Sequence, residues 1–331
     1  APIVAHNPDL DLLLTVPPQV LFGRQRLFRL PRELLRWRNV SYDLVLSFHA
    51  GQRINQFIRL LRGKGFVGPG RGNLLAWATP DGHGFPSGLN HYVDIYPGIV
   101  REAATLAGIA HKGIPLPKAH IEITPDEQAE TNILLGTHGL KRGHYLAVFP
   151  GGGVNPGESG IVRRYPAMAS AIALFLEKQP DVPIVFLGLK SDTEAIANVT
   201  AALQPNHSIV DLHGKTTLRQ YASLLHAAGV VVTGDSSAMH IASACNIPTV
   251  AIFGPTDPRT KVNPLANVRV LAPEIPQETY RGRFLGDPQE ALRTFEAIDP
   301  HAVATALLEA WFDSSSAGMH LYPSTCADNF E

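Results

Sequence analysis

The second half of the chain alternates short apolar runs with longer segments in which apolar residues recur at helical spacing. The apolar runs are residues 145–149, 183–187, 208–212, 229–233 and 249–253, and the helical segments between them are 166–179, 191–203, 217–228 and 236–245. Runs this short and this apolar are typical of strands buried on both faces. Strands that alternate with helices favour a parallel sheet covered by helices, with any ligand at the carboxyl ends of the strands. We therefore predict an α/β fold.

The first half carries a similar pattern less regularly. Residues 40–48 form a short run rich in β-branched and aromatic side chains, which predicts a strand, and 52–62 follow with helical spacing. Residues 63–88 are rich in glycine and proline and are predicted to be mostly loop. Further helices are predicted over 91–107 and 125–135. These elements indicate a second, strand-loop-helix region ahead of the regular one.

The segment 137–144, with two glycines, is the candidate linker between these regions. We predict an N-terminal domain over 1–138 and a C-terminal domain over 139–298. A last helix opens at Asp299-Pro300, where proline costs no hydrogen bond. It belongs to a third region, 299–331, with a loose tail, and the expected packing partner of this region is the N-terminal domain.

Composition excludes several classes of protein. The chain has 331 residues, of which 45% are apolar and 17% charged, a balance typical of globular rather than disordered chains. No apolar run is long enough to cross a bilayer, and the N-terminus lacks the layout of a secretion signal. We therefore expect a cytoplasmic protein. Only Cys245 and Cys326 occur, too few for a disulfide framework or a cysteine-rich metal site.

The net charge of −1 hides an asymmetry along the chain. Residues 1–80 hold 11 Lys and Arg against 4 Asp and Glu, a net charge of +7, whereas the remainder carries −8. Clustered cations attract a phosphorylated acceptor, an acidic membrane surface or a nucleic acid. No nucleic-acid-binding motif accompanies the arginines, so we expect no such partner. A solvated helix face explains the charge run equally well.

Four loops carry residues suited to binding an anion. The glycines in 149–153, FPGGG, would let main-chain N–H groups approach a ligand closely. Residues 163–166, RRYP, put two guanidinium groups before a helix, where they suit a phosphate pair. The segments 233–240 and 253–258 follow two neighbouring strands. Each alone is also compatible with an ordinary capped turn, but at adjacent strand ends they would line one crevice.

The last two segments resemble a known family. Residues 235–242, DSSAMHIA, and 248–258, PTVAIFGPTDP, are similar to the signature of the family 9 glycosyltransferases, the lipopolysaccharide heptosyltransferases, which reads D-[ST]-G-x-x-H-x-A and P-x-x-x-x-[FY]-G-P-T-[DS]-P. Residues 212–218, 163–166 and 42–45 fall where the family carries similar segments. The resemblance implies a GT-B-type pair of Rossmann-like domains with parallel sheets. The first domain would bind the acceptor and the second a nucleotide-sugar.

The resemblance also implies roles for single residues. Arg163 would steady the diphosphate of the donor, and Asp235 would hold sugar hydroxyls. The turn at Ser236 and Ser237, together with His240, would form a helix start that binds the diphosphate. Charge on the leaving diphosphate would then be offset by a cation and a helix N-terminus, so the family needs neither a metal nor another cofactor.

The rest of the implied donor site lies in other loops. Asp192 or Glu194 would hold the ribose, and Lys215 falls near an adenine-contacting position of an ADP-linked donor. The implied site is completed by Gly151, Gly152, Gly153, Gly254, Pro255 and Thr256.

Two features depart from the family pattern. Ser237 stands where the family has glycine, which alters the main-chain approach to the phosphates. The chain begins at Ala1 with a segment that resembles one well after the Gly-Asp loop of the family's general base, so the N-terminal domain would lack its first strand-helix segment. His49, at the end of the strand 40–48, is our substitute candidate for the base. A core or loop histidine is the plainer interpretation.

We therefore hypothesise a metal-independent inverting glycosyltransferase that moves heptose from an ADP-heptose-type donor to a lipopolysaccharide-core or other anionic acceptor. Its basic N-terminal region would contact the inner face of the cytoplasmic membrane. Two alternatives stay open. One is a serine hydrolase with Ser236 as nucleophile, because GDSSA is a loose nucleophile elbow and Asp287 and His301 follow in the required order. The other is a catalytically inactive sugar-nucleotide-binding protein.

Overall fold

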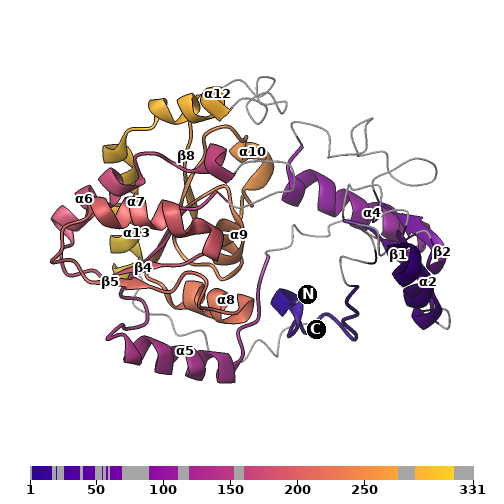
Figure 1. Cartoon of the computed structure of the whole chain (residues 1–331). Helices are drawn as coiled ribbons and strands as arrows, with labels where there is room; N and C mark the ends of the chain where they lie inside the picture. Colours follow the sequence, from indigo (N-terminus) through magenta and orange to yellow (C-terminus); the bar gives the residue numbers. More distant parts are fainter. Residues whose placement is uncertain are drawn as a thin grey trace.

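Two parallel sheets organise the molecule. The computed structural model describes residues 2–16, 20, 26–37, 40–48, 54, 57–58, 60–68, 89–110, 119–152, 160–274 and 288–316. A two-stranded sheet pairs β1 (Ser41–Leu46) with β2 (Arg62–Val67), and a six-stranded sheet has the order β5-β4-β3-β6-β7-β8. Figure 1 shows the larger sheet and its helices to the left of the smaller one. The predicted α/β fold with parallel sheets is confirmed.

Every neighbouring pair in the six-stranded sheet is parallel. Its strands are β3 (Leu146–Phe149), β4 (Ile184–Phe186), β5 (Ile209–Asp211), β6 (Val230–Gly234), β7 (Thr249–Ile252) and β8 (Val268–Leu271). Phe149 pairs with Thr233, and Gly234 pairs with Ile252. The carboxyl ends of β3, β6 and β7 therefore lie side by side, and the five strands predicted in this half are confirmed.

Helices cover both faces of this sheet. They are α6 (Met168–Lys178), α7 (Thr193–Ala202) and α13 (Pro300–Ser316) on one face and α8 (Leu218–Ala227) and α9 (Ser237–Ala244) on the other. Two shorter helices, α10 (Pro258–Lys261) and α12 (Pro288–Arg293), belong to the same region. Leu146 and Val148 pack with α6, α7 and α13 in one core, whereas Ala147 and Phe149 pack with α8 and α9 in the other. Alternate residues of a strand point to opposite faces. The continuous apolar runs therefore serve two cores at once.

Helix α5 (Pro125–Thr137) packs beside α8, away from the two-stranded sheet. Leu135 and the preceding Ile123 join the same core as Phe149. The predicted boundary after residue 138 assigned this helix to the N-terminal domain. Its apolar face is instead buried with the C-terminal sheet, and the half-buried Ile3 of the short helix η1 (Pro2–Val4) packs against the same core.

The last helix also packs on the C-terminal sheet. In α13, Val303, Leu307 and Ala310 are buried against α6 and the strands β6 and β7. Arg269 of the edge strand β8 pairs with Asp313 of α13. We predicted packing on the N-terminal domain, and residues 300–316 correct this prediction, because their apolar face covers the six-stranded sheet.

The N-terminal part is built around β1 and β2. It includes α2 (Arg26–Trp37), a π-helical turn η2 (His91–Ile95) and α4 (Tyr96–Leu106). Val67, Ile95 and Ile99 form its small core. The prediction of loop after residue 62 was wrong for β2, whose sequence RGKGFV hides the apolar pattern. Gly63 permits this pairing, because a Cβ there would lie 2.8 Å from the Val45 side chain.

Among the described residues, no helix is both long and apolar enough to cross a bilayer.

Candidate active site

The loops singled out by the sequence meet at the carboxyl edge of the six-stranded sheet. Gly151 follows β3, and Asp235 follows the neighbouring β6. The 3-10 helix η3 (Gly160–Arg163) packs on the end of β6: a Cβ on Gly234 would lie 3.0 Å from the carbonyl oxygen of Arg163. Glycine at position 234 thus lets Arg163 approach this edge. Gly153 lies outside the described residues.

The loop after β3 packs against the buried carboxylate of Asp192. Asp192 is 2% exposed, and its Oδ2 accepts a hydrogen bond of 2.8 Å from the Leu189 N–H. A Cβ on Gly151 would collide with Oδ1 of Asp192. Because any larger residue would collide with this carboxylate, the close approach requires glycine at position 151. Asp192 is therefore a support of the loop.

Glu194, the other candidate for holding a ribose, is exposed, and its Oε2 accepts a hydrogen bond of 3.3 Å from Arg164 Nη1. The spacing of Ser191 and Glu194 also suits a capping box at the start of α7. The structure corrects that expectation. The N-cap of α7 is Asp192, and its side chain makes no cap hydrogen bond, because the carboxylate turns back to Leu189.

Helix α9 starts directly at the end of β6. Its N-cap is Ser236, whose Oγ accepts from the Ala238 N–H at 3.2 Å and lies 2.7 Å from Thr233 Oγ1. Ser237 follows as the first helical residue. The first N–H groups of a helix have no partners within it and carry a partial positive charge. This start is therefore suited to an anion.

These contacts leave little support for Ser236 as a nucleophile. The hydroxyl is buried and engaged as a helix cap. His301 is exposed at the start of α13, where its Nδ1 lies 3.2 Å from Asp299 Oδ1. Asp287, the third member of that hypothesis, lies outside the described residues.

Lys215 lies on the same sheet edge but farther along it. It follows β5, which is separated from β6 by β4 and β3. Its Nζ donates to the Asp211 carbonyl at 2.7 Å. Near it, the His213 ring bridges two residues: Nδ1 lies 2.5 Å from Asp211 Oδ1, and Nε2 lies 3.0 Å from Thr193 Oγ1. The loops after β4 and β5 are thereby held together.

The loop after β7 is buried and tightly packed. A Cβ on Gly254 would lie 2.5 Å from the Phe295 ring. The hydroxyl of Thr256 has no hydrogen-bond partner in the part of the chain that the structure describes. Asp257 caps α10 by accepting from the Arg259 N–H at 2.9 Å. Pro255, also predicted in the donor site, is buried in the same turn.

Two residues of the N-terminal part, Asn90 and Tyr92, also contact the elements of this site, and we did not predict them. Tyr92 Oη lies 3.0 Å from His240 Nδ1. Asn90 donates to the carbonyl oxygens of Arg259 at 2.6 Å and Val262 at 3.0 Å. No local motif in residues 90–92 predicts these contacts, because the partners of Asn90 and Tyr92 lie at least 148 residues away in the chain.

Burial lowers the pKa of two histidines at this site, His91 and His240. It lowers the pKa of His91 to about 4, with a further contribution from the charge of Lys261. Burial also lowers the pKa of His240, and Asp235 opposes this shift. Both imidazoles are therefore neutral at neutral pH.

His49, our candidate base, lies outside the described residues. Within the described ranges, no three His, Cys, Asp or Glu side chains form a group that could hold a metal ion.

Comparison with known sequences identifies similar proteins. The family model of glycosyltransferase family 9 (heptosyltransferase) matches residues 89–278. Lipooligosaccharide heptosyltransferase 2 of Haemophilus influenzae is 26% identical over 268 residues, which cover 78% of this chain and 72% of that protein. Lipopolysaccharide heptosyltransferase 2 of Escherichia coli is 39% identical over 77 residues, 23% of this chain and 22% of that protein.

Solved structures share the fold. A family 9 glycosyltransferase from Veillonella parvula superposes with a TM-score of 0.70 at 18% identity, covering 94% of this chain and 85% of that one. An E. coli heptosyltransferase with ADP gives a TM-score of 0.52 at 18% identity, covering 87% and 80% of the two chains. The predicted GT-B-type architecture is confirmed.

Proposed function

This chain belongs to glycosyltransferase family 9, the heptosyltransferase family, and from this premise we propose that it transfers heptose from ADP-heptose to a lipopolysaccharide-core or similar anionic acceptor. The chain is a glycosyltransferase. The observation that carries the proposal is the packing of the Arg163 backbone on Gly234 beside the start of α9, so that an arginine and the first N–H groups of a helix lie at one sheet edge, where they suit a diphosphate.

In the proposed complex, the donor diphosphate lies at the start of α9. The N–H groups of Ser236 and Ser237 and the guanidinium of Arg163 would hold its oxygens, and Asp235 would accept hydrogen bonds from sugar hydroxyls. Glu194 is a better candidate than Asp192 for the ribose, because it is exposed whereas Asp192 is engaged under Gly151. Lys215 keeps its proposed place near the adenine.

The proposed reaction inverts the anomeric centre. The acceptor hydroxyl oxygen forms a bond to the anomeric carbon on the face opposite the diphosphate, and the bond from that carbon to the diphosphate oxygen breaks. Negative charge accumulates on the departing ADP, where Arg163 and the start of α9 stabilise it. These groups would replace a metal. The hydroxyl proton passes to a base, for which His49 remains our candidate.

Calorimetric titration tests the donor assignment. We expect ADP-heptose to bind at least tenfold more tightly than UDP-, GDP- or CMP-sugars, since the base and ribose contacts add to the diphosphate contacts. Gly151→Ala should weaken ADP binding about tenfold, because its Cβ displaces the loop against Asp192. Gly136→Ala is the matched control, as a Cβ there meets nothing within 4 Å. Equal affinity for all four nucleotide types would contradict the proposal.

A transfer assay separates an enzyme from a binding protein. Release of ADP from ADP-heptose should require a heptose-deficient lipopolysaccharide core, and product analysis should show inversion. Binding without release in the presence of any such core would instead support the catalytically inactive alternative.

A further inference from the structure

We propose that Tyr92 is a positioning residue for His240. It donates its phenolic hydrogen to Nδ1 and thereby holds the imidazole in the tautomer that carries its proton on Nε2, ready to donate to an anion. Because this inference rests on the proposed function, the anion is a phosphate group of the donor. Tyr92 lies in η2, in the N-terminal part, and so helps to form a site whose other residues lie in the C-terminal part.

The geometry places the two side chains in direct contact. Tyr92 Oη lies 3.0 Å from His240 Nδ1, and their ring centroids are 6.2 Å apart. Both side chains are half-buried. A hydrogen bond shielded from water holds its partners more firmly than an exposed one.

The direction of this hydrogen bond follows from the partners available. A neutral imidazole has one N–H and one acceptor nitrogen. If Nδ1 donated to Tyr92, the phenolic hydrogen would need another acceptor, and the described residues offer it none besides His240. Donation by Tyr92 satisfies both groups. Burial also raises the pKa of Tyr92 to about 12, so its proton stays in place at neutral pH.

Tyr92 is itself held firmly by its surroundings. The side-chain oxygen of Asn90 accepts from the Tyr92 N–H at 2.8 Å and from the Val93 N–H at 3.1 Å. The amide nitrogen of Asn90 donates to the carbonyl of Arg259 in α10 and to that of Val262 at the end of this helix. The ring of Tyr96 meets that of Tyr92 edge-on at 5.8 Å. The phenol is therefore placed before any ligand arrives.

The arrangement explains how a neutral histidine serves an anion site. With Nδ1 accepting from Tyr92, no described residue is a partner of His240 Nε2. The charged groups that influence His240 are Asp235 and Lys261, while His91 lies near enough for His240 to affect its titration. A fixed Nε2–H adds a directed donor to the site without adding a charge.

Nuclear magnetic resonance of the full chain with ¹⁵N-labelled histidine tests the tautomer directly. We expect His240 of the wild type to show the Nε2–H form at neutral pH. In Tyr92→Phe, the ¹⁵N shifts should move to the average of two tautomers, and the Kd for ADP should rise three- to tenfold. Tyr96→Phe, at the start of the adjoining helix α4, is the matched control, and it should change neither the tautomer nor the Kd.

A second variant separates positioning from general packing. In a His240→Ala background, Tyr92→Phe should have no further effect on the Kd for ADP, because Tyr92 acts through His240. An Nδ1–H tautomer in the wild type, or an undiminished effect of Tyr92→Phe without His240, would overturn the inference. A wild type that binds no ADP would contradict the proposed function, whereas the tautomer readout would still decide whether Tyr92 positions His240.

Discussion

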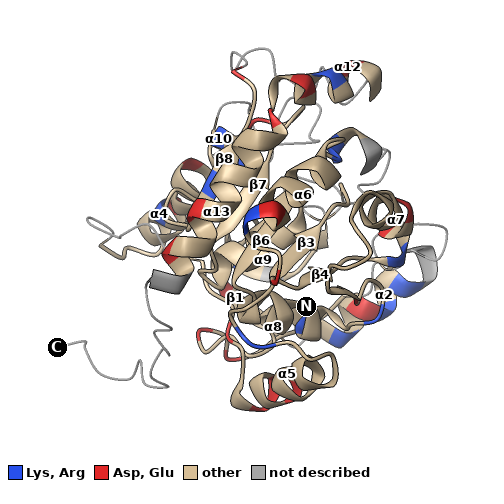
Figure 2. Cartoon of the chain, turned by 90° about the vertical axis from the view of Figure 1, so that its left-hand side faces the viewer, with Lys and Arg blue, Asp and Glu red and all other residues tan. Residues whose placement is uncertain are grey.

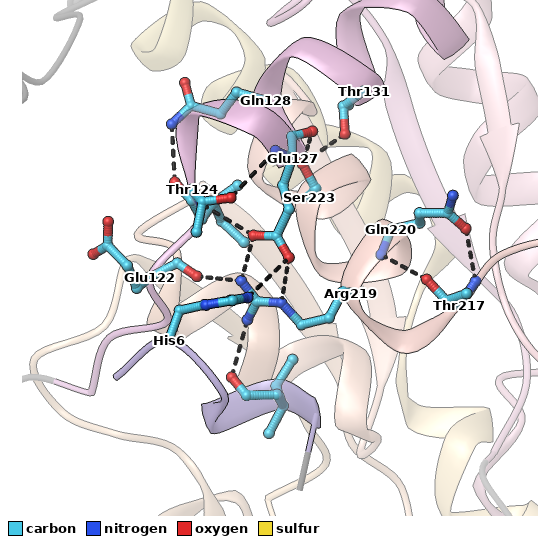
Figure 3. A network of polar contacts seen from close by, with 12 residues as sticks. His6, Glu122, Thr124, Glu127, Gln128, Thr131, Thr217, Arg219, Gln220 and Ser223 are labelled. Atoms are coloured by element: carbon cyan, nitrogen blue, oxygen red, sulfur yellow. Dashed lines mark hydrogen bonds and ion pairs between the residues drawn. The ribbon is translucent and has the colours of Figure 1, made fainter. Parts of the chain in front are cut away.

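Glu127 of α5 is paired with Arg219 of α8. Arg219 donates to it through Nε at 2.7 Å and through Nη2 at 2.5 Å, and it also donates to the carbonyls of Ile3 and Glu122. Figure 3 shows these bonds converging on the Arg219 guanidinium, with Thr124 beside them. One arginine thereby ties α5 and the N-terminal segment to α8.

The Glu127 carboxylate contributes to stability in a defined pH range. The hydrogen bonds from Arg219 are the main cause that lowers its pKa from 4.5 to about 2. A carboxylate with a lowered pKa stabilises the native state above its unfolded pKa, and this contribution is lost as the pH falls through its folded pKa. We expect Glu127→Gln to lower the free energy of unfolding by about 2 kcal/mol at pH 7. Urea denaturation of both proteins at several pH values measures this change in the free energy of unfolding.

The difference between Glu127→Gln and the wild type should shrink as the pH falls from about 4.5 toward 2. Glu130→Gln, an exposed change on the same helix, should alter stability little at any pH. A loss in Glu127→Gln that does not depend on pH would show that the ionised pair is not its source.

At the scale of elements, the start of α9 serves both the fold and the proposed site. Ser236 caps the helix and is bonded to Thr233 of β6, which fixes where the first helical N–H groups point. We expect Ser236→Ala to lower the free energy of unfolding by about 1 kcal/mol, the usual value of an N-cap. The same change should weaken ADP binding, because those N–H groups lose their fixed direction. Denaturation and calorimetry measure the two effects.

Thr217→Ala is the matched control for this prediction. Thr217 caps α8 through a capping box with Gln220, so its loss should cost a similar free energy. It should leave ADP binding unchanged. A serine-directed fluorophosphonate should not label Ser236, because the hydroxyl is a helix cap and its partners in the described part of the chain include no base; labelling there would favour the hydrolase alternative.

At the scale of the whole molecule, the excess of positive charge in residues 1–80 has one described cluster, on helix α2. Figure 2 shows several Lys and Arg residues along α2, one of which, Arg36, pairs with Glu33 of the same helix. Arg29, Arg32 and Arg36 are exposed on this helix, as is the apolar Leu35. Exposed cations beside an apolar side chain suit the surface of an anionic bilayer. We therefore predict that α2 is the part of the chain that contacts the membrane surface.

Vesicle sedimentation tests this prediction. The wild type should bind vesicles rich in phosphatidylserine at low salt and leave them at high salt, since screening weakens the attraction. Changing Arg29, Arg32 and Arg36 together to Gln should reduce binding at least tenfold, at about 1 kcal/mol for each charge.

A control removes three cations elsewhere, by changing Arg101, Lys141 and Lys178 to Gln. It should keep most of the binding, because these exposed residues lie outside α2. Equal losses in the two triple variants would indicate a response to net charge alone.

Much of the larger sheet was predictable because its strands are buried on both faces. Their apolar runs, such as residues 230–232, leave no polar position to confuse the pattern. The strand β2 was missed because two glycines and a lysine replace the apolar residues that mark a strand. The edge strand β8 was missed for a related reason: it is half-exposed, and Arg269 interrupts it.

The amino-acid sequence alone determined the parallel α/β architecture and the family, since both depend on short local patterns such as residues 235–242 and 253–258. Only the tertiary structure decided that α5 and α13 cover the C-terminal sheet and that Tyr92 meets His240. The physical reason is distance along the chain. A strand or a capped turn is specified by neighbouring residues, whereas a contact across 148 positions depends on how all the intervening elements pack.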